Sequence, residues 1–135
     1  MTDKIVVLVT AGSEKEAERI ARALVGKRLA ACVNLVNPVQ SVYRWEGKVT
    51  KEAEVLLVIK TSRTLFEQVR HEVENIHSYH VPEIICLPII DGSANYLNWL
   101  AGSIASPPEG VRTFPLRKKK SRKSAKKKHK KKSRK

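Results

Sequence analysis

The apolar residues of this chain fall into short runs and helical repeats that alternate from its beginning. The continuous apolar run at residues 5–9 is followed by turn residues at 10–13, which is typical of a strand buried on both faces. Ser13 suits a helix N-cap, and apolar residues then recur at helical spacing, at Ala17, Ile20, Ala21 and Leu24. The pattern therefore predicts a first strand and a helix that ends near Gly26.

A long hairpin is predicted next. Residues 31–43 alternate largely between apolar and polar positions, but Asn37 and Pro38 interrupt them, and the missing amide donor of proline predicts a bulge or an edge there. Residues 45–48 form the turn, with Gly47 at the position that needs positive φ, and residues 49–60 form the third strand. The outer half of this hairpin should project beyond the core.

The following residues repeat the strand and helix plan. Residues 62–76 predict a helix capped by Ser62, and residues 84–90 predict a fourth strand. Because crossovers are right-handed, two interleaved units of this kind form a four-stranded antiparallel sheet with both helices on one face. The fold class is thus α/β (α+β), a ferredoxin-like βαββαβ sandwich. An extra helix at 94–104 and a short last strand at 111–116 follow it.

This architecture leaves one face of the sheet without helices. Contiguous apolar patches seldom stay exposed, and unpaired strand edges attract other strands. The overlong hairpin adds a second surface of the same kind. We therefore expect a closed symmetric oligomer, either a cyclic trimer or a dimer.

The charge of the chain is concentrated at its C-terminal end. The sequence has 27 Lys and Arg against 13 Asp and Glu, and residues 117–135 hold 14 of the cations and no acid. Residues 1–116 are therefore formally neutral, and their size suits one domain. The high net charge is a property of the tail, so it does not make the domain itself a nucleic-acid-binding module.

Residues 117–135 are predicted to be a disordered Lys/Arg-rich tail, because they lack the apolar residues needed to offset chain ordering. Such a polycation attaches to nucleic acid or another polyanion without sequence preference and in a salt-dependent way. The alternative is a solubilising extension or an added tag. The cations assigned to this role are Arg117, Lys118, Lys119, Lys120, Arg122, Lys123, Lys126, Lys127 and Lys128.

Location and catalysis are judged from missing motifs. The apolar run near the N-terminus is too short for a signal peptide core or a membrane span, so we expect a cytoplasmic protein without a membrane span. Nucleophile elbows, phosphate-binding glycine loops and paired metal motifs are missing, so we expect a non-enzyme. Cys32 and Cys86 lie in apolar runs, which favours reduced, buried thiols over a facing thiolate pair that binds Cu(I).

Five ordered segments carry a family resemblance. They are "AACVN" at 30–34, "SVYRWEGKV" at 41–49, "EVLLVIKT" at 54–61, "HSYHVPEI" at 77–84 and "YLNWL" at 96–100. In order and spacing they resemble the divalent-ion tolerance proteins called CutA, over nearly all of residues 3–105. The resemblance implies a ferredoxin-like subunit in a stable homotrimer, similar to the PII signalling proteins. It also implies a role in tolerance of, or response to, copper and other divalent metals.

The resemblance further implies metal ligands, which transfer only in part. Bacterial members have a Cys before the Thr-Ala that closes the first strand and a His pair before Pro-Tyr. The matching positions here are Val9, Ile76 and His77, so one of these ligands is retained. His80 lies three residues after His77, and Cys32 offers a thiolate, so these three residues are the candidate ligands for copper or another divalent cation. The alternative is that both histidines are surface residues.

A small-molecule cleft is a separate possibility. Aromatic walls with a few charges would arise if an oligomer brought the hairpin and the end of the second helix together, and the residues concerned are Tyr43, Trp45, Lys60, Tyr79 and Glu83. The alternative is subunit packing. The function expected is a CutA-like metal tolerance trimer with a polyanion-binding tail. The alternative is a structural trimer hub or small-ligand signalling protein that the tail tethers to nucleic acid.

Overall fold

The computed structural model describes residues 2–106, and its element order is the one predicted. The elements are β1 (Lys4–Ala11), α1 (Glu14–Gly26), β2 (Cys32–Trp45), β3 (Lys48–Ser62), the 3-10 turn η1 (Arg63–Leu65), α2 (Phe66–Ile76), β4 (Ile84–Pro88) and α3 (Ala94–Ser103). The predicted last strand at 111–116 and the tail at 117–135 lie outside the described residues.

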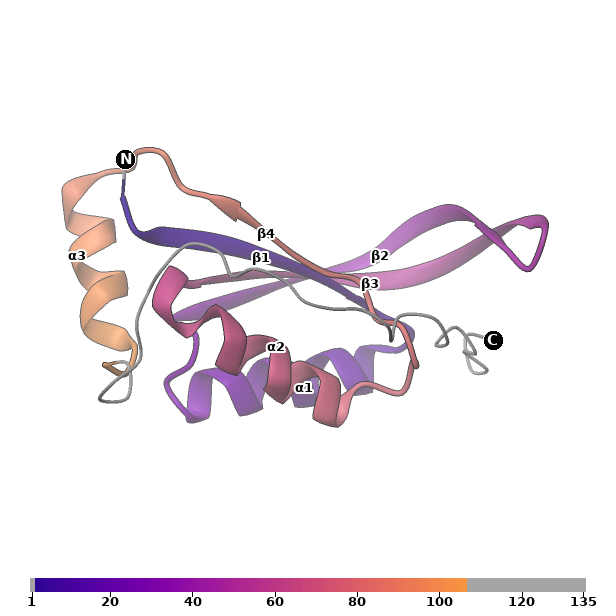
Figure 1. Ribbon diagram of the computed structural model, residues 1–135, viewed down its shortest axis with the longest axis horizontal. Helices are drawn as coiled ribbons and strands as arrows, with labels where there is room; N and C mark the ends of the chain where they lie inside the picture. Colours follow the sequence, from indigo (N-terminus) through magenta and orange to yellow (C-terminus); the bar gives the residue numbers. More distant parts are fainter. Residues whose placement is uncertain (1, 107–135) are drawn as a thin grey trace, which may run out of the picture.

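The four strands form one sheet in the order β2-β3-β1-β4, and each neighbouring pair is antiparallel. Helices α1 and α2 lie side by side on one face of this sheet, and α3 lies at one end (Figure 1). Each helix crosses from one strand of its unit to another on the same face, as right-handed crossovers require. The ferredoxin-like βαββαβ fold with an added C-terminal helix is therefore confirmed.

The core lies between the helices and the sheet face that they cover. Fully or almost fully buried apolar side chains fill it, and they are Ile5, Val7, Val9, Leu57 and Ile59 from the sheet and Ile20, Leu24, Val69 and Val73 from the helices. The alternate residues of β1, Val6 and Leu8, are only half-buried. The prediction that this strand is buried on both faces was wrong, because within residues 2–106 helices α1 and α2 cover only one face of the sheet.

The two helices begin differently, although a serine precedes each. Ser13 caps α1 as predicted, and its hydroxyl accepts a hydrogen bond from the Glu16 amide at 3.1 Å. Ser62 makes no such cap. It is the last residue of β3, paired with Lys4, and its hydroxyl lies 3.4 Å from the Asp3 carboxylate. The η1 turn then intervenes and α2 begins only at Phe66, so the predicted Ser62 cap was wrong.

The β2-β3 hairpin is longer than the rest of the sheet. Its register shifts between Val36 and Val39, which is the bulge predicted at Asn37 and Pro38. Gly47 has the positive φ expected in the turn, +81°. The pairing of β3 with β1 ends at Val55, so residues 39–54 form a two-stranded ribbon that projects from the sheet (Figure 1).

The sheet face without α1 and α2 carries apolar side chains, and we call it the open face. Direct strand partners point to the same side, and β1 and β4 pair Val6 with Leu87 and Leu8 with Ile85. Leu87 and Ile85 are 47% and 49% exposed. Strand β4 ends at Pro88, two residues earlier than predicted, because that residue already pairs with Ile5 near the start of β1.

Candidate functional site

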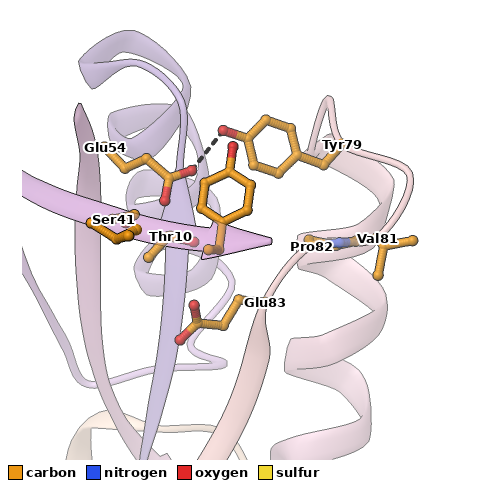
Figure 2. A pocket seen from close by; sticks show the side chains of 9 residues that line it. Thr10, Ser41, Glu54, Tyr79, Val81, Pro82 and Glu83 are labelled. Carbon is orange, nitrogen blue, oxygen red and sulfur yellow. Dashed lines mark hydrogen bonds between the residues drawn. The ribbon is translucent and has the colours of Figure 1, made fainter. Parts of the chain in front are cut away.

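A pocket of about 370 Å³ lies at the root of the projecting ribbon. It is lined by residues from the end of β1, from both hairpin strands and from the loop between α2 and β4, namely Thr10, Ser41, Val42, Tyr43, Glu54, Tyr79, Val81, Pro82 and Glu83. We call it the hairpin-root pocket. Figure 2 shows Glu54 and Tyr79 together on one side and Glu83 apart from them. Its volume is in the range of small-molecule sites, roughly 300–1,000 Å³.

The Glu54 carboxylate is the most buried charged group of this pocket. Glu54 is 3% exposed, and the Tyr79 hydroxyl donates a hydrogen bond of 2.8 Å to its Oε2 (Figure 2). Tyr79 reaches it by crossing the end of β1 at Gly12, where a Cβ would lie 2.9 Å from the tyrosine hydroxyl. Glycine at position 12 therefore allows the loop after α2 to close over the sheet and place Tyr79 on Glu54.

His77 holds this loop in place. Its Nε2 donates to the Thr10 carbonyl oxygen at 2.8 Å, and its Nδ1 accepts from the Tyr79 amide at 3.1 Å. Glu16 Oε2 lies 3.2 Å from Nδ1 and accepts a hydrogen bond from the Ser78 amide. Both ring nitrogens are thus engaged in joining α1, β1 and the loop, and the His77 side chain is fully buried.

The structure brings together part of the predicted cleft. Tyr43, Tyr79 and Glu83 line the hairpin-root pocket. Trp45 does not, because it lies at the hairpin turn paired with Lys48. Lys60 does not either, because it pairs with Cys32 at the opposite end of the sheet and donates to Asn34 and to the Val58 carbonyl.

Sequence reasoning missed several pocket residues, above all Glu54 and Thr10. Glu54 stands directly before the apolar run of β3, and an acid in that place was a usable signal for a buried polar site. Thr10 gave no such signal, because a threonine at a strand end is ordinary in a turn. The remaining missed residues are Ser41, Val42, Val81 and Pro82.

The candidate metal ligands lie in different parts of the molecule. Cys32 is opposite Lys60, which in turn pairs with Val6, whereas His77 contacts Thr10 four residues further along β1. At the usual rise of a strand this is roughly 13 Å. Residues 2–106 contain no group of three or more His, Cys, Asp or Glu side chains that could hold a metal ion. His80 is exposed, which agrees with the alternative that it is a surface residue.

Both cysteines are free thiols, but neither is buried. Cys86 is exposed because β4 is an edge strand, and Cys32 is half-buried on the open face. The predicted burial was therefore wrong. Tyr96 of α3 lies beside Cys32, and partial burial together with this thiol raises the pKa of the tyrosine.

The hydrogen bond between Tyr79 and Glu54 should stabilise the fold. Replacing Tyr79→Phe is expected to lower the free energy of unfolding by about 1–3 kcal/mol, because a buried carboxylate loses a donor. Tyr43→Phe is the control, since it removes a hydroxyl that bonds the more exposed Glu52 and should cost less. Denaturant unfolding at one protein concentration measures both, and equal losses would contradict the prediction.

No helix within residues 2–106 is long and apolar enough to cross a membrane. The polybasic residues assigned to nucleic-acid binding lie outside the described part of the chain.

The family model and the similar proteins found by comparison all concern CutA proteins. The family described as "CutA1 divalent ion tolerance protein" matches residues 5–103. The divalent-cation tolerance protein CutA of Thermus thermophilus is 50% identical over 95 residues, which cover 70% of this chain and 92% of that protein. The chloroplastic protein CutA of Arabidopsis thaliana is 48% identical over 99 residues. These residues cover 73% of this chain and 54% of the Arabidopsis protein.

Solved structures agree. The crystal structure of CutA1 from Oryza sativa superposes with a TM-score of 0.75 at 44% identity, covering 77% of this chain and 95% of that one. The family match over residues 5–103 includes the hairpin and the loop that carries His77 and Tyr79. The chain therefore belongs to the CutA family of divalent-cation tolerance proteins.

Proposed function

We propose that this protein acts as a homotrimer in tolerance of, or response to, divalent cations, and that it does so without catalysing a reaction. The observation that carries this is the family match over residues 5–103, which includes a relative named for divalent-cation tolerance that is covered almost completely. A strain that lacks its own CutA should become more sensitive to Cu(II), and this chain should restore growth. Restoration failing despite normal protein levels would contradict the proposal.

The homotrimer is supported by the surface of the subunit. The open face exposes Val36, Ile85 and Leu87, and the projecting ribbon exposes Val42 and Val49. Burying such side chains contributes about 25 cal/mol for each Å² of apolar area removed from water. A closed ring in which ribbon and open face meet neighbouring subunits would cover both surfaces.

The sequence names His77, His80 and Cys32 as candidate copper ligands, but we infer that the described residues do not fit a copper site built within one subunit. A copper or zinc site needs several ligands at bonding distance. His77 uses both ring nitrogens in hydrogen bonds, and Cys32 lies at the other end of the sheet. A metal would have to displace the Thr10 or Tyr79 contact of the histidine.

Calorimetric titration with Cu(I), Cu(II) and Zn(II) tests this directly. We expect no saturable binding at sub-micromolar concentration, because the ligands do not converge. His77→Ala and Cys32→Ser are the variants to compare with the unaltered chain. Tight binding at one metal per subunit that either variant abolishes would contradict the prediction and establish copper binding through these residues.

A second candidate function is supported by a specific observation. The hairpin-root pocket has the volume of a ligand site and is lined by aromatic, apolar and carboxylate side chains. We infer that it takes a small ligand, which makes the protein a small-ligand signalling protein rather than only a structural hub. This function is compatible with a role in divalent-cation tolerance.

For the tail we propose attachment to nucleic acid or another polyanion by charge alone, and for the protein a cytoplasmic location. The 14 cations and absent acids of residues 117–135 support the first. The name of the Arabidopsis relative contains "chloroplastic", so fractionation of cells that express the tagged chain is the direct test of location.

A further inference from the structure

A chemically labile peptide bond lies in the loop between β4 and α3, at the end of the sheet opposite the projecting ribbon (Figure 1). Asp91 is followed directly by Gly92, and this is the one place in the sequence where Asp or Asn precedes glycine. We propose that Asp91 is a modification site, at which the chain rearranges slowly to isoaspartate through a cyclic imide formed with the Gly92 nitrogen.

The reaction is an intramolecular condensation followed by hydrolysis. The backbone nitrogen of Gly92 attacks Cγ of the Asp91 carboxyl group in its acid form, the carboxyl hydroxyl leaves with the amide proton as water, and a five-membered imide ring closes. Water then opens the ring. Addition at the side-chain carbonyl restores aspartate, whereas addition at the former main-chain carbonyl leaves the chain running through Cβ and Cγ. Water is released and then taken up, so no oxidant, reductant or cofactor is consumed.

The loop places the nucleophilic nitrogen on this carboxyl group. The Gly92 N–H donates a hydrogen bond of 2.8 Å to Oδ1 of Asp91. The side chain is therefore folded over the peptide bond that follows it, with the nitrogen beside the group that it must attack. Both residues are exposed and belong to no helix or strand, so they are open to the water that the second step needs.

Glycine at position 92 removes the usual obstacle to ring closure. Without a Cβ, the residue after the aspartate adopts a wide range of backbone conformations, and no side chain blocks the carboxyl group. A Cβ at this position would lie 3.4 Å from the side chain of Leu97, which is an ordinary contact, so the structure accepts alanine there. Gly92→Ala is therefore a variant that should slow the reaction and still fold.

Asp3 is an internal comparison, because it is the only other aspartate of the chain. The amide that follows it, on Lys4, donates to the Thr2 hydroxyl at 3.0 Å. The Lys4 ammonium group also bonds the Asp3 carboxylate and lowers its pKa, which favours the ionised form over the acid that reacts. Lys4 begins β1, and its pairing with Ser62 of β3 restrains this peptide bond. We therefore expect isomerisation at Asp91 and not at Asp3.

Isomerisation at Asp91 would change the start of α3. Ser93 caps this helix, and its hydroxyl accepts a hydrogen bond from the Tyr96 amide at 3.2 Å. Isoaspartate lengthens the main chain by one methylene group just before this cap, and displacement of Ser93 takes the acceptor away from the first turn. The other end of α3 is held separately, because the Ala105 amide donates to the Arg28 carbonyl oxygen, so the change should stay local.

The test is accelerated ageing of the full chain at mildly acidic pH and physiological temperature, followed by peptide mapping. Trypsin releases residues 71–112 as one peptide, in which Asp91 is the only aspartate. Its isoaspartyl form elutes separately at unchanged mass and accepts a methyl group from S-adenosylmethionine when an isoaspartyl methyltransferase is added, whereas deamidation of asparagine changes the mass. We expect this form to accumulate with time at residue 91, and the peptide that carries Asp3 to stay unmodified.

Two variants and a fragment complete the experiment. Asp91→Glu should abolish the modified form, because glutamate must close a larger and less favourable ring, and Gly92→Ala should slow its accumulation severalfold. Equal rates in Gly92→Ala and the unaltered chain, or the same product in Asp91→Glu, would overturn the proposal. An unmodified protein would overturn it too, and isomerisation of a synthetic peptide of residues 86–97 under the same conditions would then show that the fold protects this bond.

Hydrogen exchange tests the consequence for α3. In the aged protein, the Tyr96 and Leu97 amides should exchange faster than in fresh protein, while amides in the middle of α1 keep their rates. Unchanged exchange at Tyr96, in a sample shown to contain isoaspartate, would overturn the effect on the helix and leave the modification site standing. Neither result would bear on the proposed homotrimer or on the role in cation tolerance.

Discussion

Removal of residues 117–135 is expected to abolish binding of the protein to DNA and RNA. All of the excess positive charge lies in this segment, and residues 1–116 carry equal numbers of cations and anions. Polycations bind by releasing counterions from the phosphate backbone, so affinity falls steeply with salt. In a trimer three tails would act together, and losing them would reduce affinity by several orders of magnitude. Electrophoretic mobility shift at low and high salt measures the loss.

A partial variant serves as the matched control for this deletion. Replacing Lys126, Lys127 and Lys128 with alanine keeps most of the tail and should reduce the slope of log affinity against log salt by about 0.9 per contacting lysine. The fold of the domain should survive both changes. Nucleic-acid binding that persists after the full deletion with the same salt dependence would assign it to the surface of the domain instead.

Replacing Leu87→Asp is expected to convert the proposed homotrimer to monomers. Leu87 is 47% exposed on the open face, opposite Val6, and does not belong to the core between sheet and helices. A carboxylate placed in an apolar subunit interface has no partner to compensate for its lost hydration, so association is strongly disfavoured. Sedimentation velocity should show one subunit in place of three, while circular dichroism should show the same secondary structure.

Val25→Asp is the control for that variant. Val25 is 43% exposed on α1, and the helix covers the opposite face of the sheet. The same substitution there should leave the trimer intact. A trimer that persists in Leu87→Asp would show that the open face is covered by something other than neighbouring subunits, and dissociation in both variants would show an effect of charge rather than of place.

The course of the chain was predictable to a large extent from local patterns. Helical spacing located both long helices, and the Asn37-Pro38 and Gly47 signals located the bulge and turn of the hairpin. The errors arose where a neighbour in space decided. Ser62 stays in β3, paired with Lys4, instead of capping α2. Cys86 is exposed because β4 is the last strand of the sheet, which a residue's own segment cannot reveal.

The candidate site was predicted less completely. The sequence identifies Tyr43, Tyr79 and Glu83, and these three residues do line one pocket. Lys60 carries a charge in the same strand as Glu54, but it lies six positions further along β3, which is roughly 20 Å along a strand. The sequence identifies residue types that suit a cleft. Which of them lie close together depends on their positions along each strand and on how neighbouring strands are paired.

The sequence by itself determined the order of elements, the long hairpin, the separation of a neutral domain from a basic tail, and the family. The first three follow from periodicity, turn residues and composition, which act over a few neighbouring residues, and the family follows from the resemblance of five ordered segments. Only the tertiary structure decided that Thr10, Glu54 and Tyr79 meet, that His77 is engaged at both nitrogens, and that two carboxylates are among the described residues that line the pocket. The physical reason is that these contacts join segments far apart in the chain, and the strand register and the crossing of Gly12 by the loop after α2 bring them together.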